Sequence, residues 1–180
     1  MKIRTCDILV KSLSVDGVFK GYASVFDTED AHGDVVQKGA FLRTLLHWRL
    51  KGAWPKMLWQ HAQDQVIGVW TNMLEDDKGL YVEGKLLLEV EKAREAYALL
   101  REKAIDRLSI GFQLKRSARG VFKEREVTFL NEVDLMEVSL VTFAANDDAR
   151  VLTVKRKDES YFGNCTREKI QELCSYLKVL

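Results

Sequence analysis

His61, Ser109 and Glu137 are polar residues set in mostly apolar stretches of the sequence. His61 follows the run MLWQ, Ser109 lies within DRLSIGF, and Glu137 lies within DLMEVSLVTF. A serine hydroxyl becomes a nucleophile when a base takes its proton, and a carboxylate can fix the tautomer of that base. The three could therefore act as nucleophile, base and orienting acid. Each residue also has an ordinary structural interpretation, so the residue types alone leave catalysis and structure both open.

Strand periodicity predicts the position of the Ser109 side chain. In a strand, Ser109 would share the less apolar face with Arg107 and Gly111. A glycine at that position would leave room for an approaching backbone. This pattern is compatible with a nucleophile, although a serine followed two residues later by a glycine is common in strands.

Glu137 is the candidate for the third catalytic position. Burial of a carboxylate in an apolar strand requires a partner, which an imidazole would supply. Two acidic residues nearer the turn, Glu132 and Asp134, are rivals for this role. Alternation predicts that Glu137 shares one face of its strand with Leu135, Ser139 and Val141.

The remaining histidines and the cysteines predict no second site. His32 lies in a polar loop and His47 in a short helix, so we expect both to be solvated or partly packed. The three cysteines are too few and too widely spaced for a disulfide framework or a zinc site: Cys6, Cys165 and Cys174. No glycine-rich phosphate loop is visible, and we expect no metal or organic cofactor.

Composition predicts one globular domain followed by a tail. The chain has 180 residues, 47% of them hydrophobic, and 28 basic against 27 acidic side chains give a formal charge of +1. This balance argues against a specific nucleic-acid binder. The sequence shows neither a signal peptide nor a membrane span, so we expect a soluble protein of a reducing compartment. We place the domain at 1–150 and the tail at 151–180.

Hydrophobic patterning predicts an α+β protein that is mainly antiparallel β-structure. We expect helices over 40–50 and 89–104, and a short helix over 166–180 with Thr166 as its N-cap. Residues 27–40 read as a loop, and EDDKG at 75–79 as a hairpin turn. The expected strands cover 2–10, 17–26, 56–61, 66–75, 80–88 and 105–117, with two more within 120–146.

Four stretches in this order resemble the prohead, or capsid maturation, serine proteases of tailed bacteriophages. They are GYASVFDTEDAHGDVVQKGAF, MLWQHAQDQVIG, AREAYALLREKAIDRLSIGF and DLMEVSLVTFAAN, which together span roughly residues 20–150. The family often has a proline in a Pro-Ala pair after the last strand. Ala144 stands in that place here, which alters a turn and leaves the proposed chemistry intact.

The resemblance implies a serine endopeptidase with a β-barrel surrounded by helices, related to the herpesvirus assemblins. It implies His61 as general base, Ser109 as nucleophile and Glu137 as the third member. Its substrates would be the scaffold or the scaffolding domain of the major capsid protein, and the protease itself. It would act inside the assembling prohead in the host bacterial cytoplasm. Self-association is expected by analogy with the assemblins.

Two other classes of protein remain open on the sequence alone. A non-catalytic capsid-assembly factor could use the same fold and bind capsid protein through the tail or the basic face of the helix over 89–104. A β-barrel binding module without a viral role is the second alternative. A thiol protease fits less well, because the cysteines lie near the two ends of the chain.

Overall fold

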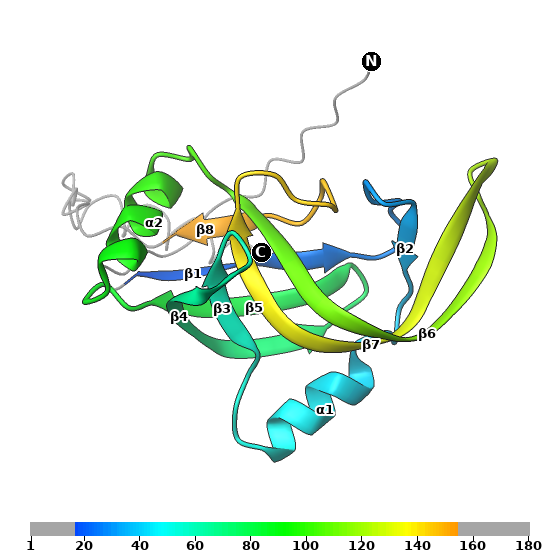
Figure 1. The fold of residues 1–180 in the computed structure, drawn as a ribbon, viewed down its shortest axis with the longest axis horizontal. Coiled ribbons are helices and arrows are strands. Elements are labelled where there is room, and N and C mark those ends of the chain that lie inside the picture. Colours follow the sequence, from blue (N-terminus) through cyan, green and yellow to red (C-terminus); the bar gives the residue numbers. More distant parts are fainter. Residues whose placement is uncertain (1–16, 155–180) are drawn as a thin grey trace, which may run out of the picture.

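The computed structural model describes residues 17–154, which form eight strands and two helices (Figure 1). The predicted strand over 2–10, the helix over 166–180 and all three cysteines lie outside the described residues. The elements in chain order are β1 (Val18–Val25), β2 (Asp34–Val36), α1 (Leu42–Leu50), β3 (Lys56–Trp59), β4 (Ala62–Glu75), β5 (Gly79–Leu86), α2 (Glu91–Arg101), β6 (Arg107–Phe122), β7 (Arg125–Val141) and β8 (Val151–Val154).

The strands form one strongly curved sheet in the order β2-β7-β3-β4-β5-β1-β8, with β6 paired to β7. Most pairs are antiparallel, whereas β2 and β3 run parallel to β7. The prediction of a mainly antiparallel α+β protein is therefore confirmed. The predicted barrel is not closed within residues 17–154, since the only backbone pairing there between β6 and the segment leading into β8 is the isolated bridge Arg107–Arg150.

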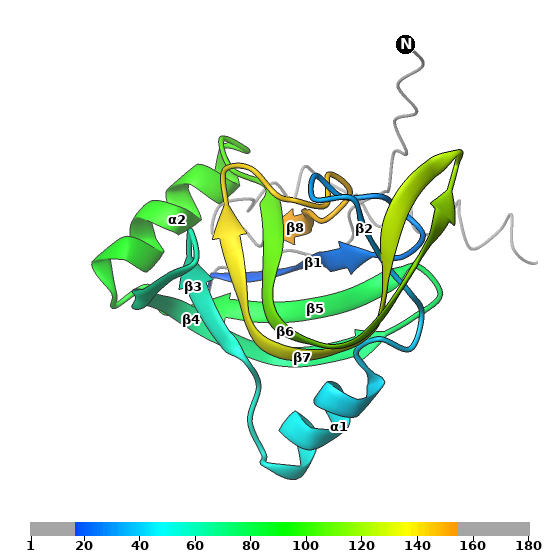
Figure 2. The same cartoon turned by 45° about the vertical axis from the view of Figure 1, so that its right-hand side comes forward.

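The core lies inside the curve of the sheet. Alternate residues of the strands point inward, and Phe19 of β1 packs edge-to-face against Trp70 of β4 with ring centroids 5.5 Å apart. Helix α2 covers one end of this core with a stripe of Ala93, Ala96 and Leu100, all buried. Helix α1 lies at another side of the sheet, beneath β7 in both views (Figure 2).

Strands β6 and β7 form the longest hairpin, which curves around the core and extends beyond it (Figure 2). The sequence predicts a strand ending near 117 and two more within 120–146, which is wrong. The structure has one turn at Lys123 and Glu124, both with left-handed φ of 50° and 67°. Asn and Gly are the usual signals for such a turn, and neither stands here.

Two other strand predictions also need correction. Strand β2 lies within the expected loop, because Asp34–Val36 pairs with β7 and buries Val35 completely. Strand β4 begins at Ala62, four residues earlier than expected. The reason is that the chain reverses at Gln60 and His61, where the sequence predicts the end of a strand.

A β-bulge at Met136 interrupts the pairing of β6 with β7. Gly111 lies opposite Glu137, but the next residue of β6, Phe112, lies opposite Leu135. Helix α1 binds the backbone at this irregularity: Thr44 Oγ1 accepts the Leu135 N–H at 3.0 Å, and Trp48 Nε1 donates to the Leu135 carbonyl at 2.9 Å. The helix thereby satisfies backbone polar groups of β7 in the gap between the residues that pair with β2 and those that pair with β3.

Candidate active site

His61 lies in a tight turn between β3 and β4. Gln60 and His61 both have left-handed φ values, 51° and 60°, and the flanking residues Trp59 and Ala62 pair across the hairpin. Two hydrogen bonds tie the turn to β7: Gln60 N–H donates to the Leu140 carbonyl at 2.9 Å, and His61 N–H donates to a serine hydroxyl at 3.3 Å. The imidazole is therefore presented from a rigid turn.

The imidazole of His61 contacts the carboxylate of Glu137, the partner the sequence favours. Nδ1 lies 2.6 Å from Oε1, and the Glu137 side chain is only 13% exposed. This hydrogen bond raises the pKa of His61 above its ordinary value, and burial opposes it only in part. With Nδ1–H donated to the carboxylate, Nε2 is the nitrogen that accepts a proton in the neutral ring.

The bulge at Met136 determines where Glu137 points. Residues opposite one another in a ladder project to the same face, so Glu137 shares the face of Gly111, whereas Leu135 shares that of Phe112. The predicted common face for Leu135 and Glu137 is therefore wrong. Leu135 is fully buried in the core, and the extra residue directs the Glu137 carboxylate to the outer side of the sheet.

Gly111 provides the space that the Glu137 side chain occupies. A Cβ atom at position 111 would lie 2.9 Å from Glu137 Cδ and closer still to Oε1. The sequence predicts that this glycine leaves room for a backbone, but the space is taken by a carboxylate. Position 111 thus has a direct influence on the His61–Glu137 contact.

Ser109 lies on β6, directly opposite Ser139 of β7, so both project to the face that carries Glu137. The predicted face is observed, since Leu108 on the opposite face is fully buried. Ser109 and His61 line the same hollow, of about 180 Å³, which opens beside the edge of β6. The structure therefore brings all three predicted residues into one region, from β3–β4, β6 and β7.

Ser139 is a polar residue of this region to which the sequence analysis gives no role. It is fully buried, and its Oγ donates to Glu137 Oε2 at 2.5 Å while accepting the His61 N–H. Its spacing of two residues from Glu137 placed it on the same face. That spacing was the available signal, but it could not show the contact with a turn 78 residues away.

The rival residues have other partners. Glu132 binds Arg43 at 3.1 Å, and Asp134 lies 3.2 Å from Thr44 Oγ1 on the side of α1. His47, expected to be solvated or partly packed, is exposed, with an edge-to-face ring contact to the adjacent Trp48. His32, expected to be solvated or partly packed, is exposed and also lines the hollow that contains Ser109 and His61, together with Asp30 and Asp34.

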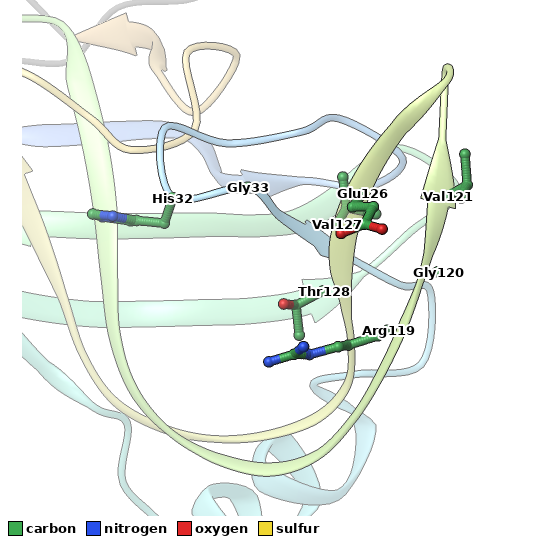
Figure 3. A pocket seen from close by; sticks show the side chains of 8 residues that line it. All are labelled: His32, Gly33, Arg119, Gly120, Val121, Glu126, Val127 and Thr128. Carbon is green, nitrogen blue, oxygen red and sulfur yellow. The ribbon is translucent and has the colours of Figure 1, made fainter.

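A larger hollow lies beside the extended part of the β6–β7 hairpin. Figure 3 shows Arg119 of β6 directed toward Thr128 of β7, with the His32–Gly33 turn opposite them. Neither His61 nor Ser109 lines it, and the His32 imidazole among its lining residues points away from the Thr128 hydroxyl. We therefore place the candidate active site at the smaller hollow, which His61 and Ser109 line.

Neither a metal cluster nor a membrane-spanning helix is found between residues 17 and 154. No three His, Cys, Asp or Glu side chains in this range are grouped so that they could hold a metal ion. Neither helix in the same range is long and apolar enough to cross a membrane.

Comparisons with known proteins agree with the sequence resemblance. The model of the caudovirus prohead serine protease family matches residues 6–162. The prohead protease of Enterobacteria phage HK97 is 32% identical over 163 residues, covering 83% of this chain and 71% of the phage protein. Among solved structures, the KSHV protease with a hexapeptide phosphonate inhibitor aligns with a TM-score of 0.43 at 9% identity. The varicella-zoster virus protease aligns at 0.42 and 14%. Each alignment covers 91% of this chain and 76% of the other.

The chain belongs to the caudovirus prohead serine protease family and is a serine peptidase of phage capsid maturation. The predicted family, enzyme class and function are thereby confirmed. Membership favours the enzyme over the non-catalytic assembly factor and over the unrelated binding module. The roles of individual residues rest on the geometry of the site.

Proposed function

We propose that Ser109, His61 and Glu137 are the nucleophile, general base and orienting acid of this peptidase. The observation that carries the assignment is the 2.6 Å contact between His61 Nδ1 and Glu137 Oε1 beside the hollow that Ser109 lines. A serine, an imidazole and a carboxylate in this relation supply the three functions that acyl transfer by serine requires.

Because His61 Nδ1 is hydrogen-bonded to Glu137, Nε2 is the ring nitrogen that takes part in proton transfer. Ser109 Oγ attacks the peptide carbonyl carbon, and its proton passes to His61 Nε2. The imidazolium then gives that proton to the departing amine as the C–N bond breaks, which leaves an ester on Ser109. Water attacks the ester by the same proton transfers and releases the acid. Glu137 remains ionised and stabilises the imidazolium at each stage.

The substrates we propose are the scaffold or the scaffolding domain of the major capsid protein, and the protease chain itself. A relative that is named a prohead protease and the family description both support a capsid-protein substrate. The enzyme would act inside the assembling prohead, in the host bacterial cytoplasm, and would self-associate there. The near-neutral charge of the chain supports action without specific nucleic-acid or membrane binding. Self-cleavage would remove the part of the predicted tail beyond β8, residues 155–180, because β8 itself belongs to the sheet.

We also infer that the curved sheet is a barrel of the assemblin type, closed at one end. Two backbone hydrogen bonds flank the Arg107–Arg150 bridge: Leu108 N–H to the Ala149 carbonyl at 3.0 Å, and Val151 N–H to the Asp106 carbonyl at 2.7 Å. These contacts join the start of β6 to the segment that enters β8. They support closure at one end of the sheet, while the rest of the β6 edge faces the hollow of the site.

The test is co-expression with the major capsid protein of the same genome, read by intact mass. Wild-type chain should shorten the capsid protein and the protease itself, whereas Ser109→Ala should shorten neither. Ser117→Ala, a matched change on the exposed part of β6, should behave as wild type. Equal shortening by Ser109→Ala would remove Ser109 from the mechanism. Normal particles without shortening by wild type would support the assembly factor.

A fluorophosphonate probe identifies the nucleophile independently of any substrate. Such a probe phosphonylates an activated serine with loss of fluoride, and peptide mass mapping locates the adduct. We expect the adduct on Ser109 in wild type and none in His61→Ala. An adduct on another serine would contradict the assignment.

A further inference from the structure

Ser139 contacts both His61, the proposed general base, and Glu137, the carboxylate proposed to orient it. Its hydroxyl donates to Glu137 Oε2 at 2.5 Å, and the other oxygen of the same carboxylate contacts His61 Nδ1 at 2.6 Å. The hydroxyl oxygen also accepts the backbone N–H of His61 at 3.3 Å. One buried side chain therefore touches both the carboxylate and the turn that presents the imidazole.

The proposed nucleophile and Ser139 face each other across the ladder, but they differ in what their hydroxyls do. Ser109 lines the hollow, whereas Ser139 is fully buried and has both a donor and an acceptor partner. A hydroxyl whose proton is already committed to a carboxylate is poorly placed to give it to His61 Nε2. Ser139 is thus suited to orient groups and not to attack a substrate.

The Glu137 carboxylate needs such an anchor because three side-chain torsions, χ1 to χ3, set the direction of its oxygens relative to the strand. Gly111 leaves space on one side of the carboxylate but has no side chain that could fix its orientation. The Ser139 hydroxyl fixes Oε2, so Oε1 is directed at Nδ1. Its contact with the His61 N–H holds a turn whose two residues have left-handed φ, a conformation that side-chain-bearing residues adopt reluctantly.

We propose that Ser139 is a positioning residue that locks the Glu137 carboxylate and the His61 turn into one rigid unit. The inference rests on the proposed triad, and it adds a fourth residue that acts through two of the three. Loss of the hydroxyl would leave a carboxylate oxygen and a backbone N–H without their partners next to the fully buried position 139, and would loosen the contact at Nδ1.

The first test uses NMR on the Ser109→Ala chain, which is inactive if the triad is correct and cannot digest itself. The chain contains only three histidines, so His32→Gln and His47→Gln variants assign the His61 signals. We expect a far-downfield Nδ1 proton from the short contact with Glu137. Adding Ser139→Ala should broaden or remove that signal and lower the pKa of His61 toward about 6.5. Ser24→Ala, a buried serine whose Oγ has no partner among residues 17–154, should change neither.

The second test measures activity and separates positioning from folding. Ser139→Ala should lower the rate of fluorophosphonate labelling at Ser109 about 10- to 100-fold, by analogy with the loss of hydrogen-bond partners that orient metal-ligating side chains. Ser139→Thr keeps the hydroxyl and should recover most of that loss, and Ser139→Cys, a near-isostere with a weak donor, should recover less. Circular dichroism and thermal unfolding identify any variant that fails to fold.

The outcomes distinguish this inference from the triad itself. An unchanged His61 signal and pKa in a folded Ser139→Ala chain would overturn the role of Ser139, whatever the activity. Full activity of Ser109→Ala would overturn the triad, yet the NMR comparison would still test Ser139. A phosphonate adduct on Ser139 would overturn both, because it would make Ser139 the nucleophile.

Discussion

The contact between His61 and Glu137 affects the pH range in which the His61 imidazole is neutral and can act as a base. Because the hydrogen bond from Glu137 raises the pKa of His61, a larger share of the imidazole is protonated near neutral pH. Only the neutral ring accepts the proton of Ser109. Labelling by a fluorophosphonate should therefore increase with pH through a midpoint above about 6.5.

Glu137→Gln should move that midpoint down toward 6.5 and slow labelling by roughly 100- to 10,000-fold, because the amide carries no negative charge and can favour the wrong tautomer. The measurement is the labelling rate between pH 5 and 9 for both chains. His32, Asp30 and Asp34 also line the hollow. His32→Gln serves as the control and should retain the wild-type midpoint; a midpoint that follows His32 would assign the profile to the wrong histidine.

The space at Gly111 is the second prediction for a single residue. Gly111→Ala should displace the Glu137 carboxylate and reduce labelling of Ser109 at least about 10-fold, because the new methyl group collides with Oε1 and Cδ. In a chain that already carries Glu137→Gln and has lost the charge, Gly111→Ala should reduce the labelling of Ser109 much less. Additive losses in the double variant would show that Gly111 acts by some route other than Glu137.

These residues also show where strand periodicity predicts the direction of a side chain correctly and where it fails. It placed Ser109 on the correct face, because β6 is regular up to Gly111. It failed between Leu135 and Glu137, since a bulge adds one residue and inverts every face beyond it. Nothing in DLMEVSLVTF signals a bulge, and the hydroxyl and indole that α1 offers to the adjacent Leu135 backbone come from residues about 90 positions earlier in the chain.

At the scale of elements, helix α1 supports the site from the far side of β7. The Thr44 hydroxyl is buried and connects Leu135 N–H with the Asp134 carboxylate. Thr44→Val keeps the shape but removes the hydroxyl, and should lower the free energy of unfolding by about 1–3 kcal/mol, the cost of unpaired buried groups. Urea unfolding in the Ser109→Ala background measures it.

Thr71→Val is the matched control for that change. Its hydroxyl donates to the Glu83 carbonyl at an exposed position, so its loss should stay within about 0.5 kcal/mol. Equal losses at positions 44 and 71 would show that α1 contributes no special support to the bulge.

The elements themselves were predictable where a local rule governs them. Helix α2 follows from its apolar spacing, and the β4–β5 hairpin from EDDKG. The turns at Gln60–His61 and Lys123–Glu124 were missed, because strand pairing across each two-residue hairpin imposes left-handed φ on residues that do not favour it locally. Strand β2 was missed for a related reason: three residues form a strand only because β7 is present to pair with them.

At the scale of the whole molecule, closure of the sheet depends on a segment beyond the predicted domain boundary at residue 150. Strand β8 pairs with β1, and Val151 and Val154 pack against the core. The Val151 N–H also reaches the Asp106 carbonyl just before β6, two residues from the Leu108–Ala149 contact. Strand β8, with the backbone contacts at its start, therefore connects β1 to β6, the strand that carries Ser109.

A comparison of two shortened chains, both carrying Ser109→Ala, isolates this contribution. Residues 1–154 retain β8, and residues 1–150 lack it, so the difference between them reports β8 alone. We expect the shorter chain to lose on the order of 2–4 kcal/mol from two half-buried valines and the lost ladder. That corresponds to a fall of roughly 5–15 °C in Tm, measured by differential scanning calorimetry. The His61 signal should persist in the shorter chain if it folds, because its partners lie on β7. Equal Tm values would place the end of the folded domain at 150 and show that β8 contributes nothing to closure.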